Sequence, residues 1–238
     1  MPDQFLSPPP DLGPQPIALP AAVDARRVAA CLGSAERVAA RPTLAAAVAE
    51  ALTEARPLLR PVAVCAVVAP GEVALLGAGP SEPGWAAVEW AVPFAATIGP
   101  TVERAATAAA GEGKLLRAMA LDAVASAACL TLTDSLVHHL ATGPAAAAGF
   151  EPVIVAFPGD EGYPLEHQPR LVSLLPSPAL TAAGLSVRES GALSPVKAVA
   201  GLIGLGRVGA GADAGDPSSL GRRSCGRCPV RGRCSFAS

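Results

Sequence analysis

Apolar positions in the first quarter of the chain follow a helical period. Between residues 23 and 58 they recur at spacings of four, as at Leu44, Val48 and Leu52. This spacing places them on one face of a helix. A Pro-Thr pair precedes Leu44, and we predict a helix start there with Thr43 as the N-cap.

A second helical pattern follows residue 100. It is broken near the GEG at 111–113 and resumes from Lys114 to about Leu140. Asp122 lies among small residues on the later helix. We expect Asp122 to have a structural role, capping or hydrogen-bonding a neighbouring backbone group, and not a catalytic one.

Continuous apolar runs of strand length alternate irregularly with these helices. They predict strands at PVAVCAVV (61–68), EVALLG (72–77), AVPFAATIG (91–99), EPVIVAF (151–157) and VKAVAGLIG (196–204). The first two strands are predicted to form a hairpin, and EHQPRLVSLL (166–175) to form a short helix. Regular βαβ alternation is missing, so an α+β domain with a mainly antiparallel sheet is predicted.

Charge and hydropathy exclude several classes of partner. The formal net charge is -2, so no global field attracts the chain to nucleic acid or to an anionic membrane. No uninterrupted apolar run approaches the roughly 18 residues of a transmembrane helix. The N-terminus lacks the charged and apolar regions of a signal peptide. We therefore expect a cytoplasmic protein, with no membrane and no nucleic acid among its partners.

The string GLGRVG (204–209) matches G-x-G-x-x-G literally. A dinucleotide site requires this string to open a helix, with an acidic residue about 20 positions later. AGADAGDPSS follows instead, and position 229 is a proline. We interpret the string as a glycine-rich exit from a strand.

The two ends of the chain differ in composition from its middle. Residues 1–22 are proline-rich and predict a loose N-terminal arm, and residues 206–238 predict a flexible linker followed by a cysteine-rich tail. The central domain is expected to span residues 23–205. Cys31, Cys65 and Cys129 lie in apolar settings and are expected to be small core residues.

The tail contains Cys225, Cys228 and Cys234 in the pattern C-x2-C-x5-C, interleaved with arginines. Three thiolates supply most of a zinc or iron–sulfur site, which normally needs four ligands. A fourth would come from a partner chain, solvent, an upstream cysteine or one of three histidines, namely His138, His139 and His167. An iron–sulfur cluster, a structural zinc and a metal-free tail remain alternative interpretations.

Several segments, in chain order, resemble one known family. PFAATIGPTVERAATAAAGEGKLLRAMALDAVASAACLTLTDSL (93–136), GYPLEHQPRLVSLL (162–175) and GLSVRESGALSPVKAVAGLIG (184–204) are similar to parts of the reactivation domain of cobalamin-dependent methionine synthase. The resemblance covers about residues 25 to 204. Short, free-standing relatives of that domain often also end in a cysteine-containing tail.

The resemblance implies a fold and an activity. The fold is an α+β unit with a curved, mainly antiparallel sheet flanked by helices. The domain docks on a corrinoid protein whose cobalt has become inactive Co(II), and it presents S-adenosylmethionine for reductive methylation of the cobalamin. The homocysteine, folate and cobalamin modules are not in this chain. The implied partner is therefore a separate corrinoid-binding protein, such as a split methionine synthase or another corrinoid methyltransferase.

The resemblance also implies ligand-binding residues. Gly162, Tyr163 and Pro164 match the Gly-Tyr-Pro end of the family's ligand loop. The arginine of that loop falls on Pro158 or on Val155, depending on the alignment. Its replacement removes the bidentate clamp that a guanidinium offers to a carboxylate.

Glu189 and Ser190 match a Glu-Ser pair of the family. By resemblance this carboxylate would orient the ammonium or ribose group of the ligand; the alternative is a solvated or loop-capping glutamate. The sequence therefore leaves three alternative functions: an S-adenosylmethionine-using reactivation protein, a non-catalytic module that binds a corrinoid protein, and a metal or redox protein acting through its tail.

Overall fold

A computed structural model describes residues 10–13, 15–20, 22–74, 85, 87–160 and 163–209. Its main sheet has the order β1-β2-β3-β7-β4, and every neighbouring pair is antiparallel. The strands are β1 (Ile17–Ala18), β2 (Val62–Cys65), β3 (Trp90–Thr97), β4 (Phe150–Ala156) and β7 (Ala198–Arg207). A separate antiparallel hairpin joins β5 (Ser186–Val187) to β6 (Leu193–Ser194). The predicted α+β class with an antiparallel sheet is confirmed.

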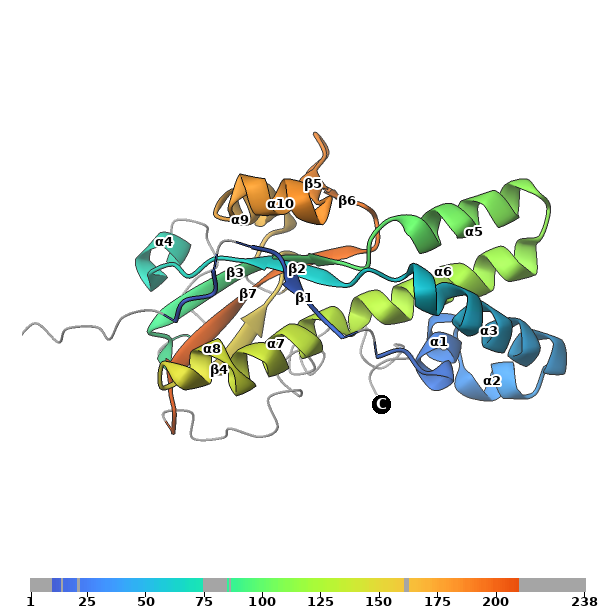
Figure 1. Cartoon of the computed structure of the whole chain (residues 1–238), viewed down its shortest axis with the longest axis horizontal. Helices are drawn as coiled ribbons and strands as arrows, with labels where there is room; N and C mark the ends of the chain where they lie inside the picture. The colour runs from blue at the N-terminus through green and yellow to red at the C-terminus, as the bar shows by residue number, and fades with distance from the viewer. Residues whose placement is uncertain are drawn as a thin grey trace, which may run out of the picture.

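Helices cover both faces of the sheet and extend beyond one end of it (Figure 1). The helices on one face are α9 (Gln168–Ser173) and α10 (Ser177–Ala183), and on the other α7 (Leu132–Thr142) and α8 (Pro144–Ala147). Beyond the sheet lie α1 (Ala25–Cys31), α2 (Ala35–Ala39), α3 (Pro42–Ala55), α5 (Thr101–Gly111) and the first part of α6 (Leu115–Leu130). Other helical segments of the described residues include α4 (Pro70–Ala74) and the 3-10 turns at Arg56–Leu58 and Leu165–His167.

The two faces of the sheet bury two separate cores, as the period of two along a strand requires. In β3, Val92 and Phe94 point into the core that contains α6 and α7, whereas Ala91 and Ala95 point into the core under α9 and α10. Because both faces are covered, β3 is apolar at nearly every position. This explains why AVPFAATIG could be identified as a buried strand from its sequence.

Two of the three glycines of GLGRVG, Gly204 and Gly206, are required by close packing within β7. A Cβ at Gly204 would lie 2.5 Å from Val88 Cγ2 and 2.6 Å from Ile154 Cγ2. A Cβ at Gly206 would lie 2.7 Å from the carbonyl oxygen of Ala87. The motif therefore lies in a strand and does not open a helix, in agreement with its interpretation from the sequence.

Two local predictions are wrong. Residues 70–74 form α4 and not the start of a second strand, since Pro70 suits the first position of a helix and the Glu72 carboxylate accepts a hydrogen bond from Ala69 N at 3.0 Å. β2 pairs with β1 and β3, and residues 72–74 of the predicted second strand lie in α4, while residues 75–77 lie outside the described residues. The N-cap of α3 is Arg41, not Thr43, because a residue before proline favours an extended backbone and Pro42 takes the first helical position.

The helix predicted from Lys114 to Leu140 is divided at Thr131. Both Thr131 N and Thr131 Oγ1 donate to the carbonyl of Ala128, at 3.1 and 2.8 Å, and this tightens the chain between α6 and α7. Within the described residues, the run Leu115–Ala147 is apolar and long enough to cross a membrane, by length and composition only. Buried residues make up 56% of its most apolar window, as expected for helices packed in a protein core.

Candidate functional site

The segment after β4 folds back on itself and positions the Gly-Tyr-Pro residues. The Asp160 carboxylate accepts a hydrogen bond from Phe157 N at 3.0 Å, and the Asp160 carbonyl accepts one from Tyr163 N at 3.0 Å. Gly159 N donates to the Tyr163 carbonyl at 2.7 Å, and Gly159 has a φ of 102° that favours glycine. Gly162 lies outside the described residues, whereas Pro164 is exposed directly after the closed loop.

Tyr163 is directed into the protein core. Its side chain is only 3% exposed and packs in the core under α9 and α10. Burial raises the pKa of Tyr163 to about 12. Its hydroxyl and the neighbouring His167 Nδ1 are both buried without a hydrogen-bond partner in the described structure, with the two ring centroids 6.1 Å apart. Tyr163 therefore anchors the loop, and its hydroxyl is not displayed at the surface.

Glu189 and Ser190 lie at the tip of the β5–β6 hairpin, where both are exposed. Arg188 N donates to the Ala192 carbonyl at 2.8 Å, and Gly191 N donates to the Arg188 carbonyl at 2.9 Å. The Ser190 hydroxyl oxygen accepts a weak hydrogen bond from Ala192 N at 3.4 Å. Ser190 thus stabilises the turn, while no ion pair engages Glu189 within the part of the chain described.

The two segments singled out by the sequence lie side by side. Gln168 Nε2 donates to the Gly191 carbonyl at 2.7 Å, and a Cβ placed on Gly191 would lie 3.6 Å from Pro169 Cγ. The Gly-Tyr-Pro segment and the Glu-Ser turn are therefore joined through the start of α9. The sequence did not single out Gln168, because a long-range hydrogen bond to a backbone carbonyl leaves no local motif.

Asp122 is connected to the sheet through a lysine that the sequence did not single out. Lys197 Nζ lies 2.8 Å from Asp122 Oδ1 and donates to Ser126 Oγ at 2.9 Å. The lysine side chain is 17% exposed and the aspartate side chain 58%. We expected Asp122 to contact a neighbouring backbone group, but its partner in the structure is the ammonium group of Lys197.

The thiols inside the domain are poor candidates for chemistry. Burial raises the pKa of Cys65 to about 12 and that of Cys129 to about 11, and it also raises the pKa of Cys31. The thiolate is the nucleophile and the metal ligand, so burial makes these thiols less reactive than an exposed cysteine. The described residues contain no group of three or more His, Cys, Asp or Glu side chains that could hold a metal ion. The tail residues Cys225, Cys228 and Cys234 lie outside the described residues.

Comparison with known proteins supports the fold. No protein-family model matches the chain, and no curated protein matches its sequence. A solved structure described as "Crystal Structure of the MetH Reactivation Domain bound to AdoHcy" matches with a TM-score of 0.55 and 13% sequence identity. The chain has the fold of that domain. The match covers 81% of this chain and 78% of the MetH reactivation domain chain.

Proposed function

We propose that this protein is a reactivation-type protein that binds S-adenosylmethionine and docks on a separate corrinoid protein to restore its methylcobalamin. In the proposed reaction a low-potential reductant supplies one electron to Co(II). The resulting Co(I) uses its electron pair to form the cobalt–carbon bond with the sulfonium methyl group. The carbon–sulfur bond breaks, its electron pair remains on sulfur, and AdoHcy is released.

The observation that carries this proposal is the shared fold together with the contact between the two candidate segments. The structural neighbour is described as bound to AdoHcy, the demethylated product of this donor. In the present chain, the Gln168–Gly191 hydrogen bond holds the Gly-Tyr-Pro segment beside the Glu-Ser turn. The exposed Glu189 carboxylate would accept hydrogen bonds from the ligand's ammonium or ribose hydroxyls.

A second candidate function is a binding module that docks on a corrinoid protein without using a methyl donor. It is favoured by the loss of the loop arginine and by the burial of the Tyr163 side chain, which together leave few polar groups for a ligand. The third hypothesis, a metal or redox function of Cys225, Cys228 and Cys234, stays a prediction. Iron, sulfide and zinc contents of anaerobically purified protein would test it.

Calorimetry with AdoHcy separates the first two functions. The first predicts saturable binding that weakens by at least about tenfold in Glu189→Gln, because a hydrogen bond to a charged group contributes about 1.5–3 kcal/mol. Glu166→Gln, on an exposed side chain of the adjacent segment, is the matched control and should bind AdoHcy like the wild type. No heat with AdoHcy, combined with capture of a corrinoid protein, would favour the binding module.

A direct assay then tests the reaction itself. The protein is mixed with S-adenosylmethionine, a low-potential reductant and a protein carrying cob(II)alamin, and the corrinoid absorption spectrum is followed. Conversion to methylcobalamin that depends on all the components supports the proposal. Spectra that remain those of cob(II)alamin with every corrinoid protein tried would refute it.

A further inference from the structure

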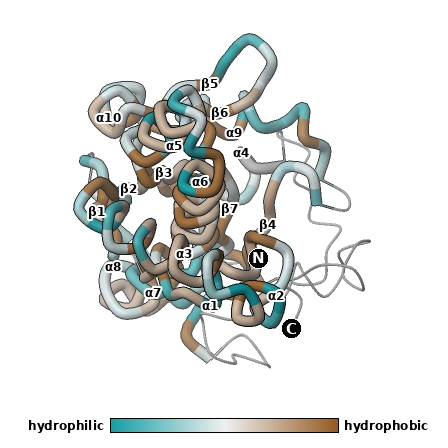
Figure 2. Tube along the Cα trace, turned by 90° about the vertical axis from the view of Figure 1, so that its right-hand side faces the viewer, coloured by the Kyte–Doolittle hydropathy of each residue, from teal (hydrophilic) through white to brown (hydrophobic). Residues whose placement is uncertain are grey.

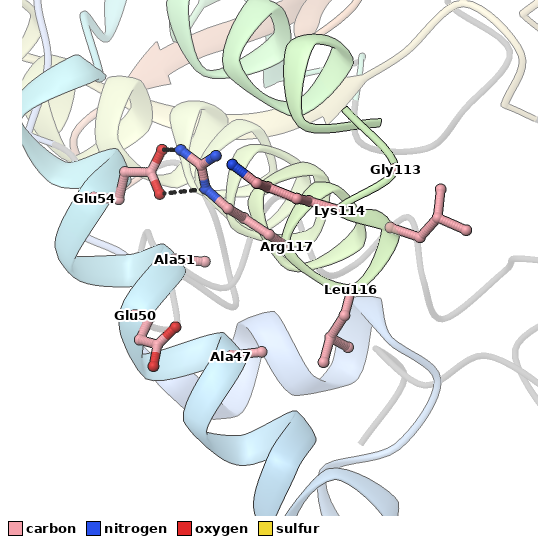
Figure 3. A pocket seen from close by; sticks show the side chains of 9 residues that line it. Ala47, Glu50, Ala51, Glu54, Gly113, Lys114, Leu116 and Arg117 are labelled. Atoms are coloured by element: carbon pink, nitrogen blue, oxygen red, sulfur yellow. Dashed lines mark hydrogen bonds and ion pairs between the residues drawn. The ribbon is translucent and has the colours of Figure 1, made fainter. Parts of the chain in front are cut away.

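A hollow of about 490 Å³ lies between α3 and the start of α6, at the end of the molecule that is farthest from the sheet (Figures 1 and 3). We call it the α3–α6 hollow. Its lining combines charged and apolar side chains, among them Glu50, Glu54, Lys114, Leu115, Leu116 and Arg117. Neither the candidate ligand segments nor the resemblance accounts for it.

The two walls of the α3–α6 hollow carry opposite charges (Figure 3). The α3 wall carries Glu50 and Glu54, and the α6 wall carries Lys114 and Arg117. Arg117 binds Glu54 through two hydrogen bonds of 2.6 and 3.0 Å, which fix this side of the hollow. Glu50 has no ion-pair partner within the described residues, and no hydrogen bond there engages its carboxylate.

Lys114 is only weakly engaged. Its Nζ lies 2.8 Å from Glu112 Oε2, but the two side chains are 58% and 55% exposed. Such exposed pairs contribute little to stability. Lys114 can therefore exchange Glu112 for another carboxylate with little loss of free energy. The lining of the hollow therefore includes one carboxylate without an ion-pair partner in the described residues and one readily exchanged ammonium group.

Apolar side chains are exposed at the same end. Leu115 is 64% exposed, Leu116 39% and Met119 57%. These are three of the seven large hydrophobic residues exposed in the described part of the chain, and they lie within five positions. Figure 2 looks onto this end, with hydrophobic stretches of α6 beside polar ones. An apolar patch rimmed by charged groups is typical of a protein interface.

We propose that the α3–α6 hollow and the adjoining Leu115–Met119 patch form the interface of a two-fold homodimer. A two-fold axis beside the hollow would place the α3 wall of one copy against the α6 wall of the other. Glu50 of each copy would then lie opposite Lys114 of the other copy, and the interface would contain two equivalent contacts of this kind. An isologous interface must be self-complementary, and a surface with one acidic and one basic wall satisfies this condition. Exposed leucines of each copy then cover the hollow of the other.

This interface leaves the candidate ligand segments free. α5 begins beside the end of the β5–β6 hairpin and leads away from it to the hollow (Figure 1). Its 11 residues span about 16 Å at 1.5 Å per residue. Dimerisation at the tip of α5 and α6 therefore does not compete with binding at residues 163–168 and 188–192.

Sedimentation equilibrium of the full chain under reducing conditions tests the proposal, since a reductant excludes intermolecular disulfides. The wild type should sediment as a concentration-dependent dimer. Glu50→Lys alone or Lys114→Glu alone should raise the dissociation constant by about 100-fold, because like charges facing each other cost several kcal/mol. The double variant restores opposite charges, and its dissociation constant should return to within about tenfold of the wild-type value.

Leu115→Asp tests the apolar part and should also give monomers. Leu130→Asp is its matched control, because Leu130 is 54% exposed on the same helix but does not line the hollow; this variant should remain a dimer. Circular dichroism confirms that each variant is folded. A wild type that is monomeric at every concentration would overturn the proposal, as would a dimer that survives Glu50→Lys and Leu115→Asp. A monomeric wild type whose capture of a corrinoid protein is lost in Leu115→Asp would assign the patch to that partner instead, and would also overturn the proposal.

Discussion

Tyr163→Phe removes one buried oxygen atom and keeps the aromatic ring. The ring packs in the core under α9 and α10 and is 3% exposed, and its hydroxyl has no hydrogen-bond partner among the described residues. A buried polar group without a partner costs about 1–3 kcal/mol, so its removal relieves part of this cost. We expect the variant to be more stable than the wild type by about 1 kcal/mol, at the low end of that range.

The pKa of Tyr163 gives the same substitution a second readout. Burial raises this pKa to about 12, whereas an unfolded chain titrates near about 10. The unfolded state therefore releases the phenolic proton first. The stability that the group contributes is fully present below about pH 10 and is lost as the pH rises towards about 12. The phenylalanine variant lacks this part of the alkaline decline, so its advantage should grow over that interval.

The composition of the chain allows both the titration of Tyr163 and the unfolding transition to be measured without interference from other residues of the same type. Tyr163 is the only tyrosine, so the phenolate absorbance of folded and urea-unfolded protein reports this group alone. Urea unfolding at neutral pH, followed by the fluorescence of the two tryptophans, gives the midpoint and the slope. A shift of the midpoint at constant slope is a change in stability.

Two results would refute the reasoning. A variant that is less stable by about 1 kcal/mol would mean that the hydroxyl makes a favourable hydrogen bond. A phenol that titrates near its ordinary value in the folded protein would mean that it is solvated. Leu165→Ala is the control, because Leu165 is 60% exposed two positions away and should change stability by no more than about 0.5 kcal/mol.

Two further substitutions test the packing around the sheet, both measured by urea unfolding. Lys197→Met removes the ion pair to Asp122 and the hydrogen bond to Ser126, and should cost about 1 kcal/mol because both contacts are partly screened; an unchanged midpoint would contradict this. Gly204→Ala places a Cβ 2.5 and 2.6 Å from two side chains and should cost about 1–3 kcal/mol, while Gly71→Ala, with nothing within 4 Å of its Cβ, should not.

Predictions from the sequence succeeded for elements in which successive residues have the same environment. β3 and β7 are apolar because both of their faces are covered, and runs of that kind can be identified without a structure. They failed at residues 72–74, because the five-residue helix α4 is specified by a proline and one capping carboxylate, and the apolar residues beside these hide that signal. The same limit applies to Thr43, since the choice between two adjacent cap positions depends on Pro42 and not on hydrophobic period.

The candidate site was predicted less completely than the fold. Motifs located the Gly-Tyr-Pro segment and the Glu-Ser turn, but not the contact between them, because that contact depends on one side chain donating to a carbonyl 23 positions away. The burial of Tyr163 was also missed. A tyrosine in a conspicuous motif suggests a role for its hydroxyl, whereas here the ring fills space in a core.

Fold and ligand binding therefore depend on different residues and can be tested separately. The fold is maintained in part by close packing around small residues, as at Gly204 and Gly206. Ligand binding would depend on the exposed Glu189 and on backbone groups held by Gln168 and the buried Tyr163 ring. Tyr163→Phe alters the interior and should leave AdoHcy binding unchanged, whereas Glu189→Gln alters the surface and should leave stability unchanged. If one variant changed both properties, the buried anchor and the exposed turn would have to act as one unit.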